Sequence, residues 1–300
     1  MFLGIDWGGT YIKAGITDNR GNLLSRRVFF SSRFKNKDAF IKKIEELTNS
    51  VRPKRINAVG IGVPGIIDTK GGFIYYLPNI PGWQKYPIRK VLEKKLNIPV
   101  AVDNDANVFA LAEARIGAAK GTNRAIFLTL GTGLGGAVII DGNIFKGRTS
   151  AGELGHVPVS LKGARCGCGG TGCIETFLGN KYLVSLYKRI KRQKNLNAEV
   201  KDIFKNALEG EEEAILVWEN FSYALGMFLS GMINVFNPEK IIFGGGVSGA
   251  FKVFKPLVWK VIENQAMWPH IKTLKLIKAK LKNAGIIGAA ILAKEQLANG

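Results

Sequence analysis

The chain of 300 residues is long enough for two domains and a large hydrophobic core. Its hydrophobic content of 46% and its charged content of 22% are typical of a globular protein. The longest stretches that are nearly free of charge, 125–140 and 221–238, are interrupted by glycines or polar residues, so neither predicts a membrane span. Because the first apolar stretch starts almost at Met1 and contains Asp6, we expect no signal peptide and a cytoplasmic location.

The net charge of +20 is the unusual bulk property of the chain. It is compatible with an anionic substrate, with nucleic acid or with an anionic membrane surface. The basic residues are spread along the chain, however, and the densest run, 188–194, lies on a predicted helix end without interleaved aromatic residues. This pattern favours a solvated surface in a lysine-rich or heat-adapted proteome. We therefore expect no specific nucleic acid partner and no membrane partner.

The first part of the chain predicts strands followed by helices. Apolar runs separated by turn residues predict strands over 2–7, 11–17 and 23–30, with turns at 8–10 and 18–22. Apolar residues at helical spacing predict helices over 37–50, 88–96 and 107–115. Two further buried strands are predicted over 57–63 and 100–102.

A similar unit returns about 125 residues later. It consists of a strand at 125–130, a glycine turn at 131–136, a strand at 137–140 and a further strand that opens at 144. Helices are predicted over 180–192, 198–208, 211–236 and 284–296, and a strand at 239–243 precedes a helix after 247. The repeat predicts two related α/β domains that face a shared cleft. We expect a small N-terminal domain over 1–106, a large domain over 107–285, and a last helix, 286–300, that packs back on the small domain.

All three cysteines, Cys166, Cys168 and Cys173, fall within eight residues, and His156 lies ten residues upstream. Three thiolates and an imidazole form a four-coordinate zinc site, and the intervening glycines allow a short loop to turn its sulfurs toward one ion. A disulfide with a spare thiol is the alternative, but the odd count and the Cys-x-Cys spacing do not favour it. Four protein ligands leave no position for water, so a structural zinc is predicted.

Three glycine loops, each following a predicted strand, indicate phosphate binding. They are Asp6–Thr10, Gly131–Gly136 and Gly244–Gly246. Glycines expose backbone N–H groups that a phosphate can approach closely, although a plain hairpin turn would use the same residues. Since no Gly-Lys-Ser/Thr follows, none is a Walker loop. Together they predict a nucleotide held between two domains.

Asp103, Asn104 and Asp105 follow the predicted strand 100–102 directly. A carboxylate at the carboxyl end of a strand suits a general base that accepts a hydroxyl proton. The alternative is a helix N-cap for the helix that follows, and the two roles are compatible if one residue caps while another acts.

These motifs occur in the order found in the ROK family of repressors, open reading frames and kinases, and the chain resembles its bacterial glucokinase branch over essentially all 300 residues. The shared motifs are D-x-G-G-T at Asp6–Thr10, G-x-P-G at Gly62–Gly65, P-N-x-x-x-W at Pro78–Trp83, D-N-D-A-N at Asp103–Asn107, G-T-G-x-G-G at Gly131–Gly136, E-x-G-H at Glu153–His156, C-x-C-G-x-x-G-C-x-E at Cys166–Glu175 and G-G-G-V at Gly244–Val247.

The resemblance implies a two-domain actin-like and hexokinase-like (ribonuclease H-like) α/β fold with an interdomain cleft. It implies that Asp105 is the general base in ATP-dependent phosphorylation of the 6-hydroxyl of glucose, and that Asp6 positions magnesium. The sugar ligands implied by the family are Gly65, Asn79, Asn104, Glu153, His156 and Glu175. The ATP-binding residues implied are Gly8, Gly9, Thr10, Thr132, Gly133, Gly244, Gly245 and Gly246. Tyr11 stands where many relatives carry lysine, and Lys13 is assigned to the phosphates in its place.

The resemblance leaves several alternatives open. Relatives act on N-acetylglucosamine, N-acetylmannosamine, mannose, fructose or allose with nearly the same residues, and some use polyphosphate as the donor. Regulators in the family carry an additional N-terminal helix-turn-helix domain, for which Asp6 leaves no room here, so we expect a kinase. The family also implies a homodimer or a homotetramer.

Overall fold

The protein is described by a computed structural model in which residues 1–51, 55–78 and 80–299 are placed. Two compact units divide the chain. Unit 1 comprises residues 1–121, 144–152 and 280–300, and unit 2 comprises residues 122–143 and 153–279. Among the described residues, no helix combines the length and the apolarity that crossing a membrane requires.

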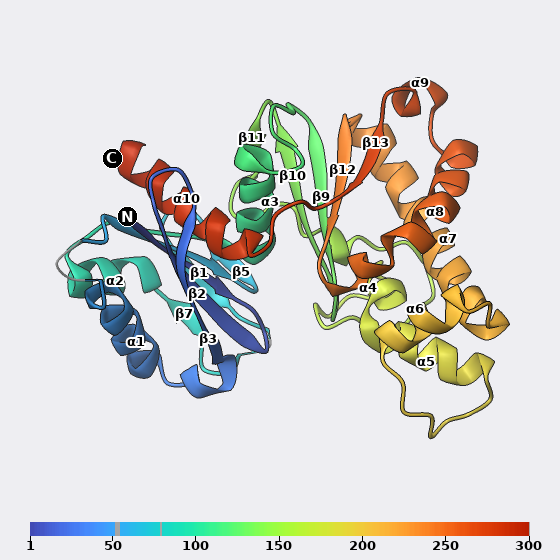
Figure 1. The fold of residues 1–300 in the computed structure, drawn as a ribbon, viewed down its shortest axis with the longest axis horizontal. Coiled ribbons are helices and arrows are strands. Elements are labelled where there is room, and N and C mark those ends of the chain that lie inside the picture. Colours follow the sequence, from blue (N-terminus) through green and yellow to red (C-terminus); the bar gives the residue numbers. More distant parts are fainter. Residues whose placement is uncertain (52–54, 79, 300) are drawn as a thin grey trace. The chain divides into compact units, whose positions relative to one another are not determined.

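Unit 1 is built on a five-stranded sheet with the order β3-β2-β1-β4-β8, of which β1, β2 and β3 are labelled in Figure 1. Its strands are β1 (Phe2–Trp7), β2 (Tyr11–Thr17), β3 (Leu23–Phe30), β4 (Ala58–Val63) and β8 (Val100–Asn104). The first three strands form an antiparallel meander, whereas β1, β4 and β8 run parallel. The carboxyl ends of these three parallel strands therefore meet at one edge of the sheet.

Four helices cover the two faces of this sheet. They are α1 (Lys37–Asn49), α2 (Ile88–Leu96), α3 (Asp105–Ile116) and α10 (Ala284–Asn299). Alternate residues of β1 separate the faces, because Ile5 and Trp7 pack with the α1 and α2 core while Phe2 packs with alanines of α10. A Cβ atom on Gly60 would overlap the backbone of Ala289, so α10 approaches the sheet through glycine. A small sheet of β5 (Ile66–Asp68), β6 (Phe73–Tyr76) and β7 (Gln84–Tyr86) completes the unit.

Unit 2 contains a second five-stranded sheet with the order β11-β10-β9-β12-β13. Its strands are β9 (Ala125–Leu130), β10 (Leu134–Ile140), β11 (Asn143–Ile144), β12 (Lys240–Gly244) and β13 (Lys275–Lys278). The helices of the unit are α4 (Glu175–Leu178), α5 (Asn180–Ile190), α6 (Val200–Leu208), α7 (Glu212–Phe236), α8 (Phe251–Gln265) and α9 (Trp268–Ile271). One core joins Leu128 and Phe243 of the sheet to aromatic residues of α7 and α8, including Trp218 and Phe254.

The two sheets repeat the same pairing. In unit 1, Asp6 lies opposite Lys13 on the antiparallel side of its strand and opposite Gly62 on the parallel side. In unit 2, Thr129 lies opposite Gly135 and Gly244 in the same way. The duplication predicted from the glycine turns is thus present in strand order and in register.

The predicted elements differ from the structure mainly in short segments. The predicted turn over 131–136 is wrong in its second half, because β10 already begins at Leu134 and pairs with Leu130 of β9. The helix expected after Val247 begins at Phe251, since a short 3₁₀ turn over Gly246–Ala250 precedes it. The sequence did not indicate β13 or the small β5-β6-β7 sheet.

Candidate functional site

The predicted site residues of unit 1 collect at the carboxyl edge of its parallel strands. Register pairs Asp6 of β1 with Gly62 of β4, and Gly62 with Asp103 of β8. The D-x-G-G-T and G-x-P-G turns therefore lie at the same sheet edge as the junction between β8 and α3, formed by Asp103, Asn104 and Asp105, which we call the D-N-D loop. This edge is where open α/β sheets bind their ligands.

The D-N-D loop combines a cap with an acidic side chain at the start of a helix. The side chain of Asn104 is the N-cap of α3, because its Oδ1 accepts a hydrogen bond of 2.8 Å from the amide of Ala106. Asp105 is the first residue of the helix, and its Oδ1 also accepts from the amide of Ala106, at 2.8 Å. The sequence left open which residue of this motif is the helix cap, and the structure assigns the cap to Asn104. Asn104 caps, and the Asp105 carboxylate lies in the first turn of the helix, where negative charge is favoured.

Asp103 is the buried member of the same loop, with its side chain 3% exposed. Its Oδ1 accepts hydrogen bonds of 2.7 Å from the amide of Asn104 and from Nδ2 of Asn107. Its Oδ2 lies 2.8 Å from Nζ of Lys146. Both oxygens of a buried carboxylate are therefore satisfied, and the backbone immediately before Asp105 is fixed.

The D-x-G-G-T turn is a closed hairpin with its exposed side at Gly9 and Thr10. The amide of Gly8 donates to the carbonyl of Tyr11 at 2.9 Å, so this amide is already engaged within the turn. The hydroxyl of Ser31 donates to the Gly8 carbonyl at 2.6 Å, and the Ser31 amide donates to the Thr10 carbonyl at 2.9 Å. Ser31 thus anchors the turn from the end of β3.

Asp6 faces the beginning of α10. A Cβ atom built on Gly285 would come within 2.9 Å of both carboxylate oxygens of Asp6, so this close approach requires glycine. Lys13 does not extend freely from the turn, because its Nζ pairs with Asp6 Oδ2 at 3.3 Å. Lys13, which is predicted to bind phosphate, is therefore paired with Asp6, the carboxylate that is predicted to position magnesium.

The G-x-P-G turn packs against the same loop. Gly65 has a φ of +141°, and a Cβ atom there would lie 2.5 Å from the carbonyl oxygen of Tyr76, so glycine is required at this position. The Gly65 carbonyl accepts a hydrogen bond of 3.3 Å from Nδ2 of Asn104. Asn79, the predicted sugar ligand of the next motif, lies outside the described residues. Trp83 of that motif is fully buried and donates its indole N–H to the carbonyl of Phe34 at 2.9 Å.

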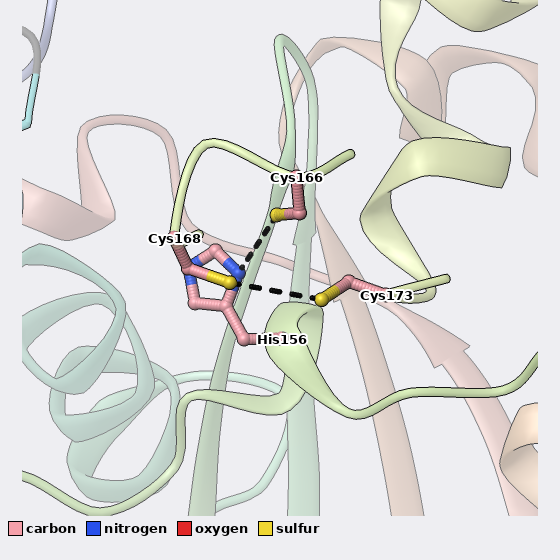
Figure 2. Close-up of side chains that lie close together, drawn as sticks. All are labelled: His156, Cys166, Cys168 and Cys173. Carbon is pink, nitrogen blue, oxygen red and sulfur yellow. Dashed lines mark hydrogen bonds between the residues drawn. The ribbon is translucent and has the colours of Figure 1, made fainter. Parts of the chain in front are cut away.

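In unit 2 the predicted metal ligands converge on one point (Figure 2). The donor atoms of His156, Cys166, Cys168 and Cys173 all lie within 4.8 Å of one another. Sγ of Cys168 lies 3.7 Å from Sγ of Cys173, and Sγ of Cys166 lies 3.5 Å from Nδ1 of His156. The cysteines form no disulfide.

These separations fit a tetrahedral zinc ion. With Zn–S bonds of about 2.3 Å and Zn–N bonds of about 2.0–2.1 Å, tetrahedral angles place two sulfurs about 3.8 Å apart and a sulfur and a nitrogen about 3.6 Å apart. The Cys168–Cys173 and Cys166–His156 distances match these values closely. Nδ1 is the ring nitrogen of His156 that lies near the Cys166 sulfur, so it is the ring atom on the side of the cluster. The chemistry of the donor set and its spacing therefore both fit zinc.

The thiols lie in unequal surroundings. Burial raises the pKa of the Cys166 thiol and also that of Cys173. A backbone hydrogen bond from Gly170 lowers the pKa of the exposed Cys168. A metal ion bound at this point would favour the thiolate form of all three cysteines.

Glu175 connects the metal cluster to the glycine loop of the same unit. Its Oε1 lies 3.0 Å from Sγ of Cys166 and 3.5 Å from Nδ1 of His156. Its Oε2 accepts a hydrogen bond of 3.4 Å from the amide of Leu134, and a Cβ atom on Gly133 would overlap the same oxygen. Glu153 precedes the short 3₁₀ turn that presents His156, whose amide donates to the Glu153 carbonyl at 3.0 Å.

The two glycine loops of unit 2 lie at one sheet edge. β9 and β12 are parallel neighbours, so the Thr132–Gly133 turn after β9 and the Gly244–Gly246 loop after β12 follow adjacent carboxyl ends. Gly245 has a φ of +82°, and a Cβ atom there would overlap the carbonyl of Leu130, the last residue of β9. The predicted anion-binding residues Thr132, Gly133, Gly244, Gly245 and Gly246 are thus neighbours within the unit.

Comparison with known proteins identifies the family. The model of the ROK family matches residues 2–296. The chain belongs to the ROK family. A glucokinase of Thermotoga maritima is 34% identical, over 98% of both chains. A ROK glucokinase of Streptomyces griseus, solved in complex with glucose and AMPPNP, is 31% identical with a TM-score of 0.83, over 98% of this chain and 99% of that one.

The family also contains regulators. A xylose repressor of Caldicellulosiruptor bescii is 30% identical over 95% of this chain and 75% of its own length. The structural similarity to the solved kinases confirms the predicted actin-like α/β fold of two domains.

Three residues that contact the predicted site residues were not found from the sequence. Ser31 hydrogen-bonds the D-x-G-G-T turn, and Lys146 pairs with Asp103. Gly285 has no side chain, which leaves space for the Asp6 carboxylate. Each lies at least 23 residues from the residue that it contacts, and none belongs to a recognised motif. No local signal in the sequence indicates them.

Proposed function

We propose that the protein is an ATP-dependent sugar kinase that transfers the γ-phosphoryl group to the 6-hydroxyl of glucose. The observation that carries this proposal is the position of Asp105, held at the start of α3 on the same sheet edge as Asp6. The similarity to a glucokinase that was solved with glucose and AMPPNP supports the choice of sugar and nucleotide.

Asp105 would act as the general base. A sugar hydroxyl does not ionise near neutral pH, so its proton has to leave as the new bond to phosphorus forms. The hydroxyl proton passes to the Asp105 carboxylate, the sugar oxygen bonds to the γ-phosphorus, and the bond between that phosphorus and the bridging oxygen of ADP breaks. Asp105 then returns the proton to solvent. Asn104 and Asp103 hold the backbone on which the base depends.

Metal ions would have two separate tasks. Magnesium, when bound with ATP, neutralises the charge of the transferring phosphoryl group, and Asp6 would hold it. Zinc would be structural, held by His156, Cys166, Cys168 and Cys173. Because Nδ1 of His156 faces the sulfurs, its Nε2 is the ring atom assigned to the sugar.

The remaining roles are assigned by motif. Gly65, Asn79, Asn104, Glu153, His156 and Glu175 would hydrogen-bond the sugar hydroxyls. Gly8, Gly9, Thr10, Lys13, Thr132 and Gly133 would hold the phosphates, and Gly244, Gly245 and Gly246 would lie beside the adenosine. Within unit 2, the hydrogen bond from the amide of Leu134 to Glu175 supports one part of this scheme, because the residue proposed as a sugar ligand lies next to the loop proposed to bind phosphate.

The test is sugar-dependent release of ADP from Mg·ATP over a panel of hexoses and N-acetylhexosamines, with the Asp105→Asn variant as the reference. We expect turnover with glucose, and a loss of at least about 100-fold in kcat in Asp105→Asn with sugar binding retained, the usual scale for removal of a general base. A preference for another sugar would keep the mechanism and change the substrate. Unimpaired turnover in Asp105→Asn would refute the assignment of the base.

The repressor match makes a sugar-responsive regulator the second candidate, because its similarity covers nearly the whole of this chain. Such a protein would bind sugar without releasing ADP.

Polyphosphate is the alternative donor, which the net charge of +20 would attract. Turnover driven by polyphosphate that falls steeply with added salt would support this donor, whereas turnover with ATP alone would exclude it.

A further inference from the structure

We propose that Lys146 is a positioning residue for the reaction, which orients the D-N-D loop, and with it Asp105, by pairing with Asp103. The inference rests on the proposed kinase function and adds a residue to it that no motif contains. Its starting point is the ion pair between Lys146 Nζ and Asp103 Oδ2, with a separation of 2.8 Å.

The ion pair is unequally exposed. The Asp103 side chain is 3% exposed and that of Lys146 is 39% exposed, so the carboxylate is buried while the lysine remains in contact with solvent. A buried carboxylate that loses its partner keeps the full cost of its desolvation. Without Lys146, the buried Asp103 carboxylate would have no cation beside it.

Asp103 lies two residues before Asp105, the proposed base, so a movement of Asp103 would affect the backbone that carries Asp105. Its other oxygen accepts hydrogen bonds from the amide of Asn104 and from the side chain of Asn107. Asn104 in turn caps α3 and donates to the Gly65 carbonyl. A rotation of the Asp103 carboxylate would thus disturb the residue that precedes Asp105 and the first turn of its helix.

Lys146 is itself held by the fold of its loop. The amide of Ala151 donates to the Lys146 carbonyl at 3.1 Å, which closes a turn over residues 146–151, and Gly147 has the left-handed φ of +57° within it. The segment 144–152 belongs to unit 1, although the chain on both sides of it belongs to unit 2. Its lysine is therefore fixed at the backbone, unlike a mobile surface lysine.

Direct contact of Lys146 with a phosphate of ATP is the rival role, and a double variant separates the two. In Lys146→Met/Asp103→Asn both charges are gone, but the amide oxygen of the new side chain still accepts the two hydrogen bonds of the loop. If Lys146 acts through Asp103, this double variant recovers turnover. If Lys146 binds phosphate, it does not.

The experiment compares kcat, the KM for sugar, the KM for ATP and the melting temperature of wild type, Lys146→Met, Lys146→Arg, Asp103→Asn and the double variant. Lys120→Met, at an exposed lysine of the same unit, is the matched control. We expect Lys146→Met to lower kcat by about 100-fold, the loss that a misplacement of about 1 Å brings. The KM for ATP should stay within about threefold of wild type, because Lys146 acts on the D-N-D loop and on no proposed phosphate ligand, whereas the KM for sugar should rise with the displacement of Asn104.

Two rescues are expected. Lys146→Arg should restore most of the turnover, since it supplies a cation to the same carboxylate. The double variant should exceed Lys146→Met by about tenfold in kcat, since a mutational coupling of this size is usual for residues in contact.

Three results would overturn the inference. They are unchanged kcat in Lys146→Met, a loss confined to the KM for ATP, and a double variant no more active than Lys146→Met. A wild-type protein that phosphorylates no sugar would instead overturn the proposed function, and the positioning role with it.

Discussion

Glu113 is a buried carboxylate that joins two points where the chain passes from one unit to the other. It is fully buried near the end of α3. Its Oε2 accepts a hydrogen bond of 2.6 Å from the amide of Ala118, and its Oε1 accepts one of 2.7 Å from the amide of Leu281. The chain leaves unit 1 after Gly121 and returns to it at Lys280. We therefore predict that Glu113 fixes both passages to unit 1.

The size of the effect follows from the two bonds. Glu113→Ala leaves two partly buried amides without this acceptor, and each such loss costs about 1–3 kcal/mol. Since both sites retain some solvent access, we take about 3 kcal/mol for the pair, which corresponds to a decrease in Tm of about 6–12 °C for a unit of this size. Glu113→Gln keeps one acceptor oxygen and should lose about half as much.

Thermal unfolding combined with hydrogen exchange measures this prediction. The amides of Ala118 and Leu281 should exchange much faster in Glu113→Ala, while amides in β9 and β12 keep their protection. Glu46→Ala, which removes an exposed carboxylate paired with Lys43, is the matched control and should leave the Tm nearly unchanged. Undiminished protection of Ala118 and Leu281 in Glu113→Ala would refute the reasoning.

Two further predictions concern unit 2. Chelation of the proposed zinc, or Cys173→Ser, should release the metal and raise the KM for sugar about 10- to 100-fold, because His156 and Glu175 lose the support that orients them. Metal content and steady-state kinetics measure this effect. A metal-free protein with an unchanged KM for sugar would contradict the prediction. The second concerns Glu211, whose pKa is lowered chiefly by a hydrogen bond from Lys191. The stabilising contribution of this carboxylate is therefore present above the ordinary carboxyl pKa and is lost as the pH falls through the lowered pKa. In Glu211→Gln, the urea concentration at the unfolding midpoint should therefore fall less steeply as the pH is lowered. A midpoint with the same pH dependence as wild type would argue against this prediction.

The parts of the site that the sequence predicted are local in the chain. Cys166, Cys168 and Cys173 lie within eight residues, so the spacing alone constrains where their sulfurs can point. Asn104 and Asp105 combine a strand end with a helix start, and cap preferences act between residues two apart. The convergence of the metal donors and a helix cap within the D-N-D motif were therefore both expected from the sequence, whereas the assignment of the cap to Asn104 comes from the structure.

The parts that were missed depend on distant contacts. Lys146 reaches Asp103 across 43 residues, and no periodicity or motif connects the two. The strands β5, β6 and β7 contain three or four residues each, which is too short for an alternating pattern to distinguish a strand from a loop. At 131–136 the glycines favoured a turn. The residues from Leu134 onward instead form a strand because they pair with β9, so tertiary contacts override the local preference.

The repeated sheet explains how one backbone arrangement supports two kinds of chemistry. Trp7 pairs with Ile12 at the end of the first hairpin, whereas Leu130 pairs with Leu134, so the turn of unit 2 is one residue shorter. At the next-to-last position of the strand that leads into each turn, unit 1 has the carboxylate of Asp6 and unit 2 has the hydroxyl of Thr129. A carboxylate there suits a magnesium ion, whereas a tight glycine turn beside a hydroxyl accepts an anion directly. This difference supports the magnesium role proposed for Asp6, beside the proposed phosphate ligands of the same turn, and the direct phosphate contact proposed at Thr132 and Gly133.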